Sequence, residues 1–346
     1  MEKVVDFINV NRDRYIDEMK RYLAIPSISA LPEHKDDVRT CAQWTRDEMS
    51  RIGLQNCRLE DTPGHPIVYG EWLNAPGAPT ILFYGHYDVQ PVDPLNLWTS
   101  PPFEATVRDG EIYARGAADD KGQVFMHFKA VEAHLKQHGS LPVNMKFLIE
   151  GEEEVGSANL DNFIKAHKDL LKADVVVISD SPMFDRGIPS ICYGLRGLAY
   201  FQIDLRGSKS DLHSGSFGGA VANPAMVLAQ ILSQMKDKSG RIKIDGFYDD
   251  VVDLRPEERA EWEKLPFNEK KYRQDLGAPK LFGETGYSTL ERVWARPTFE
   301  VNGLLSGFTG EGAKTVLPAV SMAKGSMRRV PNQEPDKIAD LFEAYL

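Results

Sequence analysis

The chain has 346 residues, of which 42% are hydrophobic and 27% charged, a composition typical of globular proteins and not of disordered ones. Its formal net charge of −10 argues against a nucleic-acid-binding surface. The opening residues do not resemble a signal peptide, and no apolar run approaches the roughly 18 residues of a membrane-spanning helix. Three scattered cysteines without a CxxC pair indicate a reducing compartment. We therefore expect a cytoplasmic protein that binds neither nucleic acid nor membrane.

The first half of the chain alternates helical and strand patterns. Apolar residues recur at near-helical spacing from Val4 to Leu23, and a second helical pattern ends at Gly53, so two helices open the chain. Strands alternating with helices then predict an α/β sheet covered on both faces. The predicted strands are 66–73, 79–84, 143–150 and 174–179, and the predicted helices are 36–52, 120–138 and 157–172.

The pattern changes near residue 198, where AYFQIDLRG alternates like a half-exposed strand. We therefore expect one domain over 1–197 and a second over 198–346. The final segment, EPDKIADLFEAYL, is amphipathic and lacks a helix-capping residue, so we expect the chain to be truncated there. Within the second domain we expect a helix at 223–236, a polar stretch at 237–285 and a strand at 320–329.

His86 and Asp88 follow an apolar strand at a spacing of two, so their side chains project to the same side if the strand continues. A carboxylate in that position can hold the imidazole ring while its other nitrogen binds a metal. The alternative is a strand-end histidine with ordinary turn contacts.

Acidic residues also stand at three other element ends. Asp119 and Asp120 precede a predicted helix, where a carboxylate can bridge two cations or cap the helix N-terminus. The three glutamates 152–154 close a strand, as either a solvated acidic turn or a metal ligand beside a general base. Asp180 follows DVVVIS, at the carboxyl end of a strand, where open α/β sheets place their sites.

This set of one histidine and several carboxylates, without a thiolate, suits zinc, manganese or cobalt better than magnesium. A bridging carboxylate suits a pair of ions roughly 3.5 Å apart.

Seven segments together resemble one family, the dinuclear zinc exopeptidases that include carnosinase, cytosolic nonspecific dipeptidase, carboxypeptidase G and the aminoacylases. The resemblance covers essentially the whole chain and is nearest to the dipeptidase branch. The segments are GHYDVQP, WTSPPFEA, YARGAADDKG, EGEEEVGS, SDLHSG, GAKTVLP and SMRRVP.

The resemblance implies a catalytic domain with a mixed sheet covered by helices, over 1–197, and an inserted α+β dimerisation domain, or lid, over 198–346. It implies a homodimer formed through the lid. It also implies two divalent ions, most simply Zn²⁺, with Mn²⁺ or Co²⁺ as alternatives.

The same resemblance implies roles for individual residues. His86 and Asp180 bind one metal, Glu154 binds the other, and Asp119 bridges them, while Asp120 supports the site without binding metal. Asp88 orients His86, and Glu153 is the general base that activates the metal-bridging water. In the lid, His213 stabilises the oxyanion in the partner's active site, and Thr315 and Arg328 bind the substrate carboxylate.

The family supplies a final histidine to the second metal, and none follows in this chain, whose last histidine is His213. The second site therefore keeps only Asp119 and Glu154, and we expect the first site to bind metal more tightly.

The leading functional hypothesis is metal-dependent hydrolysis of dipeptides or short peptides with a free C-terminal carboxylate. One alternative is a deacylase or carboxypeptidase acting on N-acyl amino acids. An alternative of another class is a noncatalytic, truncated module for metal binding or dimerisation.

Overall fold

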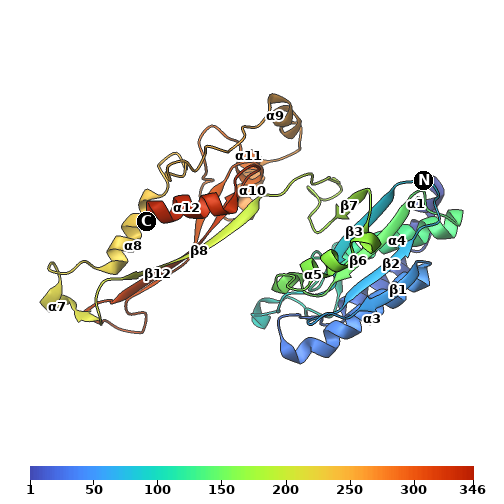
Figure 1. Cartoon of the computed structure of the whole chain (residues 1–346), viewed down its shortest axis with the longest axis horizontal. Helices are drawn as coiled ribbons and strands as arrows, with labels where there is room; N and C mark the ends of the chain where they lie inside the picture. Colours follow the sequence, from blue (N-terminus) through green and yellow to red (C-terminus); the bar gives the residue numbers. More distant parts are fainter. The chain divides into compact units, whose positions relative to one another are not determined.

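A computed structural model describes residues 1–346, which form two compact units, Met1–Ser190 and Ile191–Leu346 (Figure 1). Each unit has a hydrophobic core of its own. The boundary falls at residues 190 and 191, a few residues before the change of pattern in the sequence. None of the helices has the length and apolar character needed to cross a membrane.

The first unit is built on a five-stranded mixed sheet, which confirms the predicted fold class. Two pairings on one side of the sheet are antiparallel and two on the other are parallel. In spatial order the strands are β1 (Gln55–Glu60), β2 (Ile67–Trp72), β6 (Asn144–Glu150), β3 (Thr80–His86) and β7 (Val175–Ile178); a separate hairpin pairs β4 (Thr106–Arg108) with β5 (Glu111–Tyr113).

Helices cover both faces of this sheet because neighbouring side chains on each strand point to opposite faces. Val68 and Phe147 belong to the core beneath three long helices, whereas Ile67 and Leu148 pack with Phe163 and Leu171 on the opposite face. The helices of the first face are α2 (Arg12–Leu23), α3 (Lys35–Ile52) and α4 (Lys121–His138), with α1 (Glu2–Val10) against α4; those of the second are α5 (Leu160–Ala166) and α6 (Lys168–Leu171).

The prediction of one helix from Val4 to Leu23 is wrong, because the helix breaks at Asn11. The backbone of Asn11 leaves the helical region, with φ −96° and ψ 12°, and its side-chain amide donates to Phe7 O at 2.8 Å. Asparagine competes for backbone hydrogen bonds in this way and so favours helix ends. Three short 3₁₀ helices complete the unit: η1 (Pro32–His34), η2 (Leu95–Leu97) and η3 (Glu153–Val155).

The second unit contains a three-stranded antiparallel sheet with helices packed along it (Figure 1). Its core joins Ile203 and Ala323 of the sheet to Leu228 and Phe342 of two helices. In spatial order the strands are β10 (Thr298–Ser306), β12 (Val320–Arg329) and β8 (Gly197–Arg206); the two helices are α8 (Pro224–Gln234) and α12 (Pro335–Tyr345).

The polar stretch 237–285 contains helices that the sequence did not predict, and strand β10 was also missed. A short ladder joins β9 (Leu212–His213) to β11 (Val316–Leu317). The remaining helices are α7 (Ser214–Phe217), α9 (Pro256–Glu263), α10 (Glu269–Asp275) and α11 (Thr289–Trp294).

Candidate metal centre

One edge of the first unit's sheet gathers the carboxyl ends of three parallel strands. His86 is the last residue of β3, Asp180 lies just beyond β7, and the three glutamates 152–154 follow β6. Asp119 lies two residues before α4. Because parallel strands end at the same edge, residues far apart in the sequence converge there.

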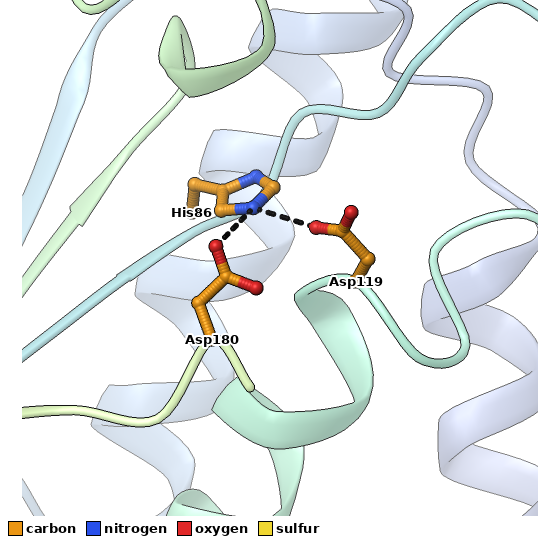
Figure 2. Close-up of side chains that lie close together, drawn as sticks. All are labelled: His86, Asp119 and Asp180. Carbon is orange, nitrogen blue, oxygen red and sulfur yellow. Dashed lines mark hydrogen bonds and ion pairs between the residues drawn. The ribbon is translucent and has the colours of Figure 1, made fainter. Parts of the chain in front are cut away.

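The structure brings His86, Asp119 and Asp180 together. His86 Nε2 lies 3.0 Å from Asp119 Oδ1 and 3.7 Å from Asp180 Oδ2 (Figure 2). One ligand atom from each of the three residues falls within 4.8 Å of the other two. Glu153 Oε2 lies at the margin of this group, 4.0 Å from the same ring nitrogen. An imidazole and carboxylate oxygens from separate segments thus face one small volume.

The other ring nitrogen of His86 faces Asp88. Nδ1 lies 3.1 Å from the main-chain oxygen of Asp88 and 3.3 Å from its Oδ1, and both side chains are fully buried. The main-chain carbonyl of Asp88 offers only an acceptor, so Nδ1 carries a hydrogen, and Nε2 of the neutral ring would keep the lone pair that a metal ion accepts.

The carboxylate of Asp88 is itself held by three donors. It accepts from the amides of Glu153 at 3.3 Å and Glu154 at 3.1 Å, and from Ser29 Oγ at 2.6 Å. These bonds join the end of β3 to the glutamate-bearing turn after β6. The sequence did not single out Ser29, because a serine in a loop carries no signal of its distant partner.

Negative charge exceeds positive charge at this edge. Burial lowers the pKa of His86, but the hydrogen bond and charge of Asp88, with other acids nearby, outweigh it and raise the pKa to about 10. Burial and neighbouring carboxylates raise the pKa of Glu153 and of Asp180. Neither of these acids nor Asp119 forms an ion pair with a lysine or arginine. A divalent cation fits this donor set and would relieve the repulsion.

Asp120 supports the strand that carries His86. It occupies the N-cap position of α4, but its side chain makes no capping bond; instead Oδ2 accepts from the backbone amide of His86 at 3.0 Å. Oδ1 is buried without a partner, and burial raises the pKa of Asp120 to about 7. The carboxylate lies against Gly85, where a Cβ would come within 2.6 Å of Oδ2. The peptide bond between Asp119 and Asp120 is cis.

Glu154 lies outside the group of three around His86. Its Oε2 accepts a 2.6 Å hydrogen bond from Gln90 Nε2. Burial and the charge of Asp119 raise the pKa of Glu154, and they outweigh this hydrogen bond, which lowers it. Glu152 points elsewhere: it is 8% exposed and accepts from His65 N and Asn159 Nδ2. The three consecutive glutamates therefore have three different environments.

In the second unit, His213 and Thr315 lie together. His213 Nδ1 accepts from the amide of Gly215 at 3.1 Å, and Nε2 lies 3.0 Å from Thr315 Oγ1. Arg328 is exposed on β12 and makes no hydrogen bond with either residue. The short ladder of β9 and β11 brings His213 close to Thr315, because it pairs His213 with Val316, the residue after Thr315.

Residues 82–330 match the sequence model of the family described as "Peptidase family M20/M25/M40". The chain belongs to this family. The match spans the ends of β3, β6 and β7 and most of the second unit, so it includes every residue of the candidate metal centre.

This M20/M25/M40 peptidase is similar over most of its length to two curated relatives and one solved structure. It is 34% identical to the "Cys-Gly metallodipeptidase dug1" of Schizosaccharomyces pombe, over 100% of this chain and 75% of the relative. It is 33% identical to the "Beta-Ala-His dipeptidase" of Homo sapiens, over 100% of this chain and 71% of that protein. The M20 family metallo-carboxypeptidase Sso-CP2 from Sulfolobus solfataricus has a TM-score of 0.83 and 39% identity, covering 96% of this chain and 75% of that one. The predicted resemblance to the dipeptidase branch is confirmed.

Proposed function

We propose that this peptidase hydrolyses dipeptides and short peptides that have a free C-terminal carboxylate. The observation that carries the proposal is the convergence of His86 Nε2 with Asp119 and Asp180 at the carboxyl edge of the sheet. The two named dipeptidases, at 34% and 33% identity, support the substrate class.

Two metal ions complete the proposed centre. His86, Asp119 and Asp180 hold the first, while Asp119 and Glu154 contribute to the second. Nitrogen and carboxylate ligands favour Zn²⁺, with Mn²⁺ and Co²⁺ as alternatives. Such ions polarise the scissile carbonyl and lower the pKa of water.

Glu153 is the proposed general base. Its Oε2 lies 4.0 Å from His86 Nε2, at the margin of the metal group, and the side chain is partly exposed. Burial raises the pKa of Glu153, which favours a carboxylate that must accept a proton. Glu153 takes a proton from the attacking water and delivers it to the leaving amine.

Asp88 keeps the ring of His86 in position during this reaction. Its carboxylate accepts from the amides of Glu153 and Glu154, so one buried acid aligns the histidine and the two glutamates. Outer partners of metal-bound histidines act in this way.

The second unit is proposed to serve as the lid and to form a homodimer. His213 then acts in the partner's active site, where its Nε2 hydrogen stabilises the oxyanion; the amide of Gly215 on Nδ1 supports this tautomer. Thr315 and Arg328 bind the substrate carboxylate, a task suited to the planar guanidinium. The three free cysteines support a cytoplasmic location.

Hydrolysis assays on the purified chain test the function. With Zn²⁺, Mn²⁺ or Co²⁺ added, we expect Cys-Gly or β-Ala-His to be cleaved faster than N-acetyl amino acids. Glu153→Gln should lower kcat by about 10²- to 10⁴-fold, the usual loss for a general base. Glu152→Gln is the matched control, because Asn159 can turn its amide to accept from the new NH₂ group.

Three results would count against the proposal. Preference for N-acetyl amino acids would favour the deacylase alternative. Absence of hydrolysis by the metal-loaded chain would leave the noncatalytic module. Equal losses of kcat in E152Q and E153Q would show that Glu153 is not the general base.

A further inference from the structure

Lys121 follows directly after the acidic pair Asp119 and Asp120 and opens α4. Its side chain is fully buried, at 0% exposure, although lysine is seldom buried without a partner. We propose that Lys121 is a positioning residue for the metal centre, which anchors the turn carrying Asp119 to the end of α2. This proposal rests on the proposed function, because it takes Asp119 to be a metal ligand.

The anchor consists of two hydrogen bonds to backbone carbonyls. Lys121 Nζ donates to Ile25 O at 2.7 Å and to Tyr22 O at 3.3 Å. Tyr22 stands one residue before the last of α2, where carbonyls lack helical partners and carry partial negative charge. Lys121 therefore reaches from the ligand turn to a helix end nearly a hundred residues earlier in the chain.

The turn that Lys121 anchors has little room to adjust. It is closed by a 3.3 Å hydrogen bond from the amide of Gly122 to Gly116 O. A Cβ at Gly122 would lie 2.1 Å from the carbonyl oxygen of Ala117. At Gly116, whose φ is +81°, a Cβ would lie 3.2 Å from Lys121 Cδ. Because the turn is packed this closely, a displacement of Lys121 would be passed on to Asp119.

The segment that accepts from Lys121 also holds the histidine side of the centre. Ser27 O accepts from Val89 N at 2.9 Å, Ser27 Oγ donates to Tyr87 O at 2.6 Å, and Ser29 Oγ donates to Asp88. Residues 25–29 thus fix the end of β3 directly and the Asp119 turn through Lys121. The lysine sets the position of one ligand loop relative to the other, with Asp120 as a second link.

Lys121→Met tests this role, because methionine keeps the length and removes both hydrogen bonds. Lys146→Met is the matched control. Lys146 is 8% exposed on β6 and likewise donates to two carbonyls at a helix end, Leu170 O at 2.6 Å and Lys172 O at 2.8 Å. It lies beneath α6 near the start of β6, four residues before Glu150 at the carboxyl end of the strand, so it is remote from the edge that gathers the proposed ligands.

Titration of the metal-free full chain with Mn²⁺ in a calorimeter, together with thermal unfolding, separates the two roles. We expect both variants to unfold at a lower temperature than the wild type. Only K121M should bind Mn²⁺ more weakly, by about 10- to 100-fold, the usual effect of losing a group that orients a ligand. Far-UV circular dichroism below the unfolding temperature should match the wild type in both.

Equal Mn²⁺ affinity in K121M, K146M and wild type would overturn the positioning role and leave Lys121 as a packing residue. Should K121M fail to fold, Lys121→Gln replaces it in the same titration, and unchanged affinity there would overturn the role equally. Failure of the wild type to bind Mn²⁺ is a different result, because it removes the metal centre itself.

Discussion

Replacing Lys129 with methionine tests how buried charges hold three helices of the first unit together. Its ammonium pairs with one acid from each of α2, α3 and α4, and these acids are only 7%, 7% and 2% exposed. The acids are Glu18, Glu48 and Glu132, which also pair with Arg14 and Arg51 at the rim. Helix α4 begins beside the metal centre, so this cluster supports the frame of the site.

The expected loss follows from the burial of the cluster. Lys129→Met removes a buried cation, and removing one partner of a buried ion pair costs about 3–5 kcal/mol. A whole domain is stable by about 5–15 kcal/mol, so the loss is large. Lys165→Met is the control, because Lys165 pairs with Asp161 at 2.5 Å while the two side chains are 64% and 72% exposed. An exposed pair contributes about 0.2–1 kcal/mol.

The loss should also depend on pH. Burial raises the pKa of Glu48 and Glu132, but bonds from Arg51 and the charge of Lys129 outweigh it and lower both values. In the wild type this stabilisation is present above the unfolded pKa of about 4.3 and is lost as the pH falls through the folded values. Without Lys129 at least one folded pKa rises. The stability that K129M loses relative to the wild type is therefore greatest near neutral pH and becomes smaller as the pH falls.

Urea unfolding of the three chains at about pH 7.5 and about pH 5 measures both effects. We expect K129M to lose several times more stability than K165M at the higher pH, and less at the lower pH. If K129M lost no more stability than K165M, or lost more as the pH falls, Lys129 would not stabilise the three helices through buried ion pairs.

Three further predictions concern the site. Asp88→Asn turns a donor toward the amides of Glu153 and Glu154 and should weaken Mn²⁺ binding about 10- to 100-fold in calorimetry; unchanged affinity would show that Asp88 does not orient His86. Gly85→Ala places a Cβ 2.6 Å from Asp120 Oδ2 and should destabilise the chain by about 1–3 kcal/mol in urea, whereas wild-type stability would mean that the contact relaxes freely. A chelator should abolish dipeptide hydrolysis and added Zn²⁺ should restore it; hydrolysis that survives chelation would exclude a metal role.

Elements with strong local signals could be predicted from the sequence. Helix α3 ends at Ile52 before Gly53, whose φ of 107° is a conformation that glycine adopts readily. Strand β12 has the predicted bounds, 320–329, because its alternation is long and regular. The edge strand β1 was missed, since its polar sequence becomes a strand only by pairing with β2.

The sequence predicted those residues of the candidate site that follow strands or lie in recognisable motifs. His86 and Asp180 follow apolar strands, so the parallel pairing of β3 with β7 brings them to one edge. Ser29 and Lys121 were not recognised because their roles depend on partners 59 and 96 to 99 residues away in the chain. Such contacts depend on tertiary packing, which leaves no local pattern in the sequence.

The most direct test of the metal centre is anomalous diffraction at the zinc edge from crystals of the wild-type chain loaded with Zn²⁺. We expect a strong peak within bonding distance of His86 Nε2 and of carboxylate oxygens of Asp119 and Asp180. A further peak beside Glu154 would mark the second ion. An anomalous map with no peak at His86, or with zinc bound only elsewhere on the chain, would contradict it.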